Sequence, residues 1–222
     1  MMLIETGFHK KIPQLLFEED VGIVIPVVRI FGNITVSHEH LEEVLKIEGL
    51  MEGLARGLNS DKKVVRTETC WVLSNIASGS THEVNFLLSH DNIINKLLML
   101  FETDVSSVKA EIASLFANFS FEGNPENIFK FYQSLGIIKF YMDNLRTDDS
   151  KLIKNCLEGL NQILELGEAF KVGNSNPFVN EILNGGGEKV LEDLQLHKDR
   201  SIYDQVVKLI SDFFVVDDSF NL

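Results

Sequence analysis

Residues 64–79, VVRTETCWVLSNIASG, decide the fold. Read as a helix, this segment spaces Glu68, Trp71 and Asn75 three and four residues apart, so the three side chains share one face. A carboxylate attracts an ammonium group, an indole packs against an aliphatic stem and a cation, and a carboxamide hydrogen-bonds a ligand backbone. In a single helix the alternative is a tryptophan buried in the core. Related stripes elsewhere in the chain favour a binding surface.

A repeat along the chain supplies those related stripes. A turn-like residue followed by an apolar helix recurs at intervals of 42, 43, 44 and 51 residues, at Gly7, Gly49, Asn92, Gly136 and Gly187. In each of the first four units a later apolar helix carries an amide 26 residues after the turn residue, at Asn33, Asn75, Asn118 and Gln162. Units of this kind bury their apolar faces by stacking, so the pattern predicts a helical array.

We expect one array over residues 1–214, followed by a frayed tail at 215–222. Its units fall at about 1–35, 36–78, 79–121, 122–167 and 168–214. Helices are expected at 3–17, 38–46, 50–58, 64–77, 176–183, 188–196 and 202–214, among others. A further helix in the first unit should have Pro26 near its first turn, where a missing amide hydrogen costs little.

The composition restricts the class of partner. A net charge of -13 disfavours nucleic acid and anionic membranes as partners and favours basic ones. Cys70 and Cys156 belong to no CxxC pair, which is typical of a reduced intracellular chain with incidental thiols. We find neither a signal peptide nor a membrane span. The motif at 38–40, HEH, fits a solvated face better than a metal site, so we expect no metal, no cofactor and no catalytic residue.

The repeat unit resembles that of a known superfamily. Three-helix units of about 42 residues, a turn glycine before the second helix, and Trp71 followed by Asn75 resemble armadillo repeats. Within that superfamily, five runs are similar, in order, to the last five of the ten repeats of importin alpha (karyopherin alpha). They are IPVVRIFGNIT, RTETCWVLSNIASG, NCLEGLNQILELGE, SNPFVNEIL and LEDLQLHKDRSIYDQVVKLISDFF. The resemblance implies an all-α, right-handed superhelical solenoid of about five repeats, the first one incomplete.

The resemblance also implies a function, that of a nuclear import adaptor found in cytoplasm and nucleus. In the family, a basic nuclear-localisation peptide lies extended along a concave groove lined by the third helices. Asparagines clamp its backbone, tryptophans pack its Lys or Arg stems, and acids accept the charged ends. Carried over by position, the groove residues are Arg29, Asn33, Glu68, Trp71, Asn75, Glu111 and Asn118, with Ser74, Ser114, Glu158 and Gln162 as weaker candidates.

Departures from the family pattern matter equally. The positions four residues before each amide read Arg29, Trp71, Ser114 and Glu158. One indole is therefore present where a sandwich needs two walls, and each missing wall should weaken binding several-fold to roughly tenfold. The first five repeats and the basic N-terminal segment are missing from this sequence, so we expect no larger signal site and no direct recruitment of importin beta.

The ends of the array suggest further partners. In the family the last repeats contact an exportin. At the other end, the first unit begins mid-repeat and exposes an apolar edge formed by Leu3, Ile4, Phe8, Ile12 and Leu15. Terminal repeats normally need a polar outer face, so this edge predicts a fragment of a longer chain, self-association, or cover by a partner.

Two functions of different classes remain open. The first is recognition of basic nuclear-localisation peptides or cargo proteins, which intact Glu68, Trp71 and the asparagines favour. The second is an armadillo scaffold with decayed signal binding that docks an exportin or another protein, which Ser114 and Glu158 favour. We prefer the first, and an enzyme is the poorest hypothesis.

Overall fold

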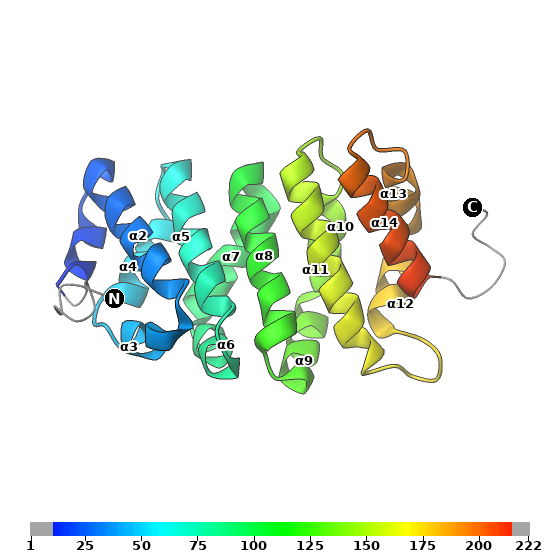
Figure 1. Cartoon of the computed structure of the whole chain (residues 1–222), viewed down its shortest axis with the longest axis horizontal. Coiled ribbons are helices and arrows are strands. Elements are labelled where there is room, and N and C mark those ends of the chain that lie inside the picture. Colours follow the sequence, from blue (N-terminus) through cyan, green and yellow to red (C-terminus); the bar gives the residue numbers. More distant parts are fainter. Residues whose placement is uncertain (1–10, 215–222) are drawn as a thin grey trace. The chain divides into compact units, whose positions relative to one another are not determined.

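The computed structural model describes residues 11–214, except for the side chain of His38, and this part of the chain contains no strand (Figure 1). It divides into two compact units, Met1–Gly123 and Asn124–Leu222. The expected start of the first helix, with Leu3, Ile4 and Phe8, and the expected frayed tail lie outside the described residues. The division into five repeats and a single array stays a prediction.

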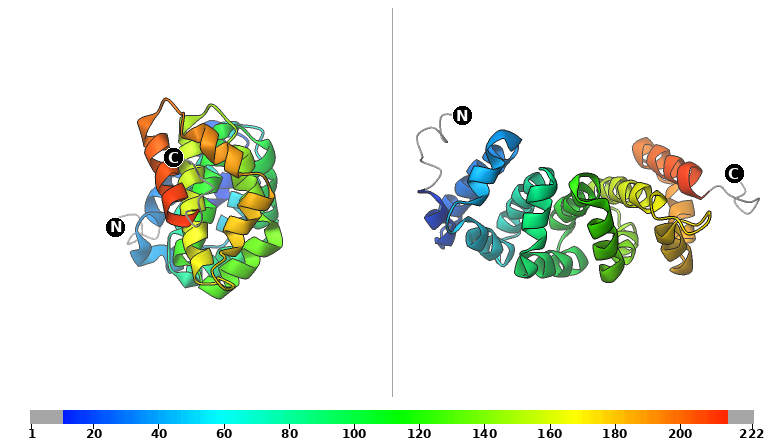
Figure 2. Two further views of the ribbon diagram at one scale, coloured as in Figure 1. Left: turned by 90° about the vertical axis from the view of Figure 1, so that its right-hand side faces the viewer. Right: turned by 90° about the horizontal axis from the view of Figure 1, so that it is seen from below.

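The first unit consists of helices of different lengths joined by short turns. They are η2 (Pro13–Phe17), α2 (Val21–Thr35), η3 (His38–His40), α3 (Leu41–Leu45), α4 (Leu50–Leu58), α5 (Lys63–Ala77), α6 (Thr81–Leu88), α7 (Asp91–Thr103) and α8 (Ser106–Glu122). In this unit α2 packs against α5 and α5 against α8, while α4 and α7 pack behind them (Figures 1 and 2). The layer of α2, α5 and α8 carries the residues of interest.

Local sequence signals explain where these helices begin. The Asp20 carboxylate caps α2 by accepting a hydrogen bond from Gly22 N at 2.8 Å. Ser80 and Glu83 form a capping box at the start of α6. Gly49 has φ of 81°, a conformation that suits glycine, and it precedes α4 as expected of a turn residue. Asn92, expected to be a turn residue as well, instead lies inside α7.

Two further expectations about the first unit were wrong. Pro26 lies inside α2 as its sixth residue and not in its first turn, because the helix begins at Val21, directly after the Asp20 cap. Pro26 therefore removes one backbone hydrogen bond within the helix. The described end of the expected helix at 3–17 is a 3-10 helix, Pro13–Phe17, which begins at a proline.

A continuous apolar core fills the space between the helices of the first unit. Phe31, Phe101, Phe116 and Phe119 are fully buried, as are Val72 and Leu73 on α5. These phenylalanines therefore pack between the helices of the first unit. Cys70 is also buried, and burial raises the pKa of its thiol, so it acts as a packing residue.

The second unit is built in the same way. Its helices are α9 (Pro125–Leu135), α10 (Ile137–Asn144), α11 (Ser150–Glu168), α12 (Pro177–Asn184), α13 (Glu188–Leu194) and α14 (Arg200–Phe213). Gly136 has φ of 60° between α9 and α10, which confirms it as a turn glycine. The long helices α11 and α14 pack against each other. No described helix in either unit is both long and apolar enough to cross a membrane.

Candidate functional site

The candidate site residues of the first unit lie on its three long helices. Arg29 and Asn33 are on α2, Glu68, Trp71, Ser74 and Asn75 are on α5, and Glu111, Ser114 and Asn118 are on α8. Helix α2 packs against α5, and α5 packs against α8, so these residues lie on neighbouring helices (Figure 1). We call the surface that carries them the amide face.

Two asparagines of the amide face make the same contact with the preceding helix. Asn75 Nδ2 donates to the carbonyl oxygen of Gly32 at 3.0 Å. Asn118 Nδ2 donates to the carbonyl oxygen of Ser74 at 2.9 Å. In both cases the acceptor residue stands just before an asparagine of the neighbouring helix. Gly32 precedes Asn33, and Ser74 precedes Asn75. Equivalent residues therefore hold α2, α5 and α8 in one register.

These contacts leave part of each carboxamide for other bonds. A carboxamide has two N–H donors and an acceptor oxygen. Asn75 uses one donor on the neighbouring helix, whereas Asn118 Nδ2 contacts both the carbonyl and the hydroxyl oxygen of Ser74. Asn75 and Asn118 are half-buried, and Asn33 is exposed. Each can therefore offer Oδ1 to a main-chain N–H of an extended chain, and Asn75 can also offer an N–H to a main-chain carbonyl.

Trp71 lies against Gly32, and glycine is required there. A Cβ atom on Gly32 would stand 2.0 Å from Trp71 Cζ3, far inside van der Waals contact. The indole is half-buried, so it is neither sealed in the core nor free in solvent. Gly32 thus supports two predicted binding residues, Trp71 by its missing side chain and Asn75 by its carbonyl oxygen.

Arg29 and Glu68 form an ion pair between α2 and α5. Arg29 Nη2 lies 2.5 Å from Glu68 Oε1, and the arginine side chain is 55% exposed while the glutamate is 18% exposed. The hydrogen bond and charge of Glu68 raise the pKa of Arg29, so the guanidinium stays charged. A carboxylate expected to attract a ligand cation therefore already has an internal cation beside it.

The remaining candidates on α5 and α8 differ in exposure. Glu111 and Ser114 are half-buried, and the Ser114 hydroxyl donates to the carbonyl oxygen of Ala110 at 3.3 Å. Ser74 is only 6% exposed, and its hydroxyl oxygen accepts a hydrogen bond from Asn118 Nδ2 at 3.2 Å. Ser74 therefore acts on the amide face chiefly by orienting Asn118.

The other two candidates, Glu158 and Gln162, are on α11 in the second unit and are not part of the amide face. Glu158 is exposed, and the Oε1 atom of Gln162 is buried with no hydrogen-bond partner. Gln205 on α14 resembles Gln162 in this respect, and the sequence reasoning missed it. The sequence spacing does indicate Gln205, because this residue follows Gln162 by 43 residues, close to the repeat length.

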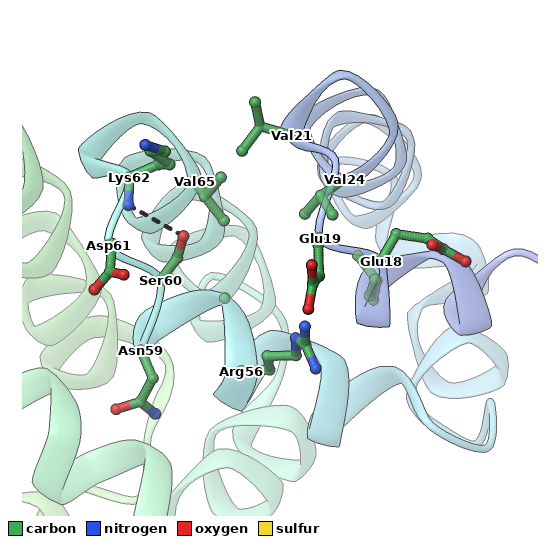
Figure 3. A pocket seen from close by; sticks show the side chains of 12 residues that line it. Glu18, Glu19, Val21, Val24, Arg56, Asn59, Ser60, Asp61, Lys62 and Val65 are labelled. Carbon is green, nitrogen blue, oxygen red and sulfur yellow. Dashed lines mark hydrogen bonds between the residues drawn. The ribbon is translucent and has the colours of Figure 1, made fainter.

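A cavity of ≈ 370 Å³ lies elsewhere in the first unit, between the starts of α2 and α5 and the end of α4 (Figure 3). Its charged lining includes Glu18, Glu19, Arg56, Asp61 and Lys62, and valines of both α2 and α5 complete it. Charges of both signs give it no preference for a ligand of one charge, and none of the predicted site residues lines it. Within residues 11–214, no cluster of His, Cys, Asp and Glu could hold a metal ion.

Comparison with known proteins shows to which family this chain is related. No family model matches the sequence. Importin subunit alpha-1b of Oryza sativa subsp. japonica is 30% identical over 217 residues, and importin subunit alpha-3 of Arabidopsis thaliana is 31% identical over 220 residues. These matches cover 96% and 97% of this chain. The chain is a homologue of importin alpha.

The match with importin alpha is confined to part of each relative. The chain spans 40% of the rice protein and 41% of the Arabidopsis protein, in their C-terminal part. This confirms the resemblance to the C-terminal half of importin alpha that the five sequence runs indicated.

Solved structures show the fold of this importin alpha homologue. A designed armadillo repeat protein in complex with the peptide (KR)4 matches with a TM-score of 0.79 at 22% identity, covering 96% of this chain and 84% of that one. Computationally designed armadillo repeat proteins for modular peptide recognition match with a TM-score of 0.78 at 20% identity, over 96% of this chain and 84% of theirs. The all-α, armadillo-repeat fold expected from the sequence is confirmed.

Proposed function

We propose that the amide face binds an extended peptide rich in Lys and Arg, as the C-terminal half of a nuclear import adaptor would. The chain is then a binding module and not an enzyme. Its importin alpha and armadillo relatives are likewise binding proteins. Its ligands would be nuclear-localisation peptides or the cargo proteins that carry them, met in cytoplasm and nucleus. One observation carries the proposal: Asn75 and Asn118 occupy equivalent positions on neighbouring helices, with Trp71 one turn before Asn75.

The chemistry of the amide face suits such a ligand. Carboxamides on successive helices can bond the main chain of an extended peptide without reading its sequence. The half-buried indole of Trp71 can pack a Lys or Arg stem, which contributes about 0.5–2 kcal/mol depending on desolvation. Glu111 adds negative charge, whereas Glu68 is paired with Arg29, and the net charge of -13 attracts a basic peptide at long range.

The first prediction concerns binding of a fluorescently labelled (KR)4 peptide to the full chain, followed by anisotropy. Asn75→Ala and Trp71→Ala should each weaken binding several-fold to about thirtyfold, because a lost hydrogen bond or cation–π contact amounts to roughly 0.5–2 kcal/mol. Asn85→Ala is the matched control, since Asn85 is exposed on α6 and lies off the amide face. It should bind as the parent does.

Salt dependence completes this test. Binding by the parent should weaken between about 50 and 200 mM salt, because exposed charges are screened over a Debye length near 10 Å. If both Asn75→Ala and Trp71→Ala bind (KR)4 as tightly as the parent, the peptide-binding proposal fails. The alternative, an armadillo scaffold with decayed signal binding, would then be preferred, as Ser114 in place of a second indole suggests.

Substitution of Arg29 should strengthen peptide binding, in contrast to substitution of Asn75 or Trp71. The guanidinium of Arg29 neutralises Glu68 and adds a positive charge to the amide face. Arg29→Met should therefore strengthen (KR)4 binding by about two- to fivefold at low salt, a modest gain because exposed ion pairs contribute about 1 kcal/mol or less. Arg56→Met, an exposed arginine on α4, serves as control for net charge alone. Weaker binding by Arg29→Met would instead mean that Arg29 contacts the peptide.

A further inference from the structure

We propose that the cavity of Figure 3, which we call the mixed-charge cavity, binds a short peptide segment of a partner protein. The segment carries an apolar side chain between a basic and an acidic residue. The cavity of ≈ 370 Å³ is lined by the η2–α2 junction and α2 on one side and by α4, the α4–α5 turn and α5 on the other. It uses no residue of the amide face, so this proposal does not depend on the function proposed above.

The rim of the mixed-charge cavity is exposed, and its wall is apolar. The exposed charged residues of the rim are Glu18, Glu19, Arg56, Asp61 and Lys62. Half-buried Val21 is the part of the apolar wall that solvent reaches most easily, and buried Val24 and Val65 complete it. Sites for small ligands commonly measure about 300–1,000 Å³ and combine apolar walls with a few polar groups. The cavity is at the small end of this range, which suits a segment of a few residues.

The charges on the rim are separated by sign. Glu18 and Glu19 precede α2 on one side, whereas Arg56 near the end of α4 and Lys62 before α5 lie on the other. Figure 3 shows Glu19 and Arg56 pointing toward each other. Within residues 11–214, however, these four side chains form no ion pair. Asp61, next to Lys62, partly offsets the positive charge of its side. A ligand with one basic and one acidic group can therefore bind both sides without displacing an internal partner.

An apolar residue between the two charged ones completes the match. Val21 and Val24 lie across the cavity from Val65 (Figure 3). An aliphatic side chain placed between them removes apolar surface of both molecules from water. The aliphatic stems of Arg56 and Lys62 extend this apolar surface. In an extended segment neighbouring side chains alternate in direction, so an inward-pointing apolar residue leaves its two charged neighbours at the rim.

The same arrangement disfavours ligands of a single charge sign. A basic peptide meets Arg56 and Lys62, and an acidic peptide meets Glu18 and Glu19. One end of either ligand therefore faces charges of its own sign. The mixed-charge cavity thus differs from the amide face in the ligand that it selects.

The test follows the valine methyl groups of the full chain by NMR during titration with the acetylated and amidated tripeptide Lys-Leu-Glu. Signals of Val21, Val24 and Val65 should shift and saturate, whereas that of Val108 on α8 should not shift. Glycine in place of the central leucine should weaken binding at least about tenfold, because the apolar contact is lost. The peptides Lys-Leu-Lys and Glu-Leu-Glu should each bind about two- to fivefold more weakly than Lys-Leu-Glu.

Variants of the cavity test the same contacts from the protein side. Glu19→Gln and Lys62→Gln should each weaken binding of Lys-Leu-Glu about two- to fivefold, the range expected for an exposed ion pair. Val21→Phe should abolish saturable binding, because the larger side chain fills part of the cavity. Glu52→Gln is the matched control, since Glu52 is exposed on α4 and does not line the cavity. It should bind as the parent does.

Three results would overturn the proposal. The valine signals could fail to shift, or shift without saturation, which would mean that the cavity holds no peptide. The glycine peptide could bind as tightly as Lys-Leu-Glu, a result that does not depend on how any variant folds. Glu19→Gln and Lys62→Gln could both bind as the parent does, which would remove the role of the rim charges. Saturation by free leucine but not by the blocked tripeptide would assign the cavity to a free amino acid and equally reject a peptide ligand.

Discussion

Gly32→Ala should disturb the amide face more than any other single methyl group. The new Cβ would stand 2.0 Å from Trp71 Cζ3, 2.6 Å from Cε3 and 2.7 Å from Cη2, so the indole must move. Overpacking of this kind typically destabilises a fold by about 1–3 kcal/mol. Because the Gly32 carbonyl oxygen also accepts the hydrogen bond of Asn75, binding of (KR)4 should weaken about tenfold or more.

Trp71 itself reports the displacement, because the chain contains one tryptophan. In Gly32→Ala the emission maximum should shift relative to the parent before any peptide is added. Gly53→Ala is the matched control, since a Cβ there would meet Leu16 Cδ1 at 2.5 Å, on α4 and away from the amide face. It should lower Tm yet leave emission and (KR)4 binding unchanged. Equal effects of both variants on emission and binding would show that Gly32 has no special role.

Several helices were predictable because they depend on patterns within single segments. The expected helix at 50–58 is α4, and the expected helix at 64–77 is α5 with one more residue at its start. The constant distance of 26 residues from each turn residue to Asn33, Asn75 and Asn118 indicated equivalent positions on successive helices. The hydrogen bonds of Asn75 and Asn118 to equivalent carbonyl oxygens are consistent with that inference.

Contacts between helices were not predictable in the same way. The Arg29–Glu68 pair and the packing of Trp71 on Gly32 depend on how two helices are offset, which no periodicity within one helix specifies. Gln205 was missed for another reason. Amide positions were predicted from the turn residue of each unit, and the longer interval of 51 residues before Gly187 moves the expected position away from Gln205. The distance from one amide to the next does predict Gln205.

A second large effect is expected at the ion pair that joins α5 to the start of α8. Arg66 Nε lies 2.5 Å from Asp104 Oδ2, and Nη2 donates to Oδ1 at 2.7 Å. Arg66 Nη1 also donates to the carbonyl oxygen of Ser60 at 2.7 Å. The side chains of Arg66 and Asp104 are 16% and 4% exposed, so water can replace little of this contact. The pair therefore holds α5 against the segment that joins α7 to α8.

Arg66→Met should lower the free energy of unfolding of the first unit by about 3–5 kcal/mol, because it leaves the buried Asp104 carboxylate without its cation. Denaturant unfolding followed by Trp71 fluorescence measures this value, since Trp71 lies on α5. Lys46→Met is the matched control in the same unit. It removes an exposed partner of Glu42 and should change stability by less than about 1 kcal/mol. A loss in Arg66→Met no larger than in Lys46→Met would contradict the prediction.

The pH dependence of the Arg66→Met effect provides an independent check. Burial raises the pKa of Asp104, but hydrogen bonds from Arg66 and from the Val105 backbone outweigh it, so the folded pKa lies below the usual 3.8. A depressed pKa means that the pair stabilises the fold above the unfolded pKa and loses this effect as pH falls through the folded value. The difference between parent and Arg66→Met should therefore be constant from about pH 7 to 5 and shrink below about pH 4. A difference that persists unchanged to about pH 2 would mean that Arg66 stabilises α5 and α8 by packing or by its bond to Ser60, and not through the charge of Asp104.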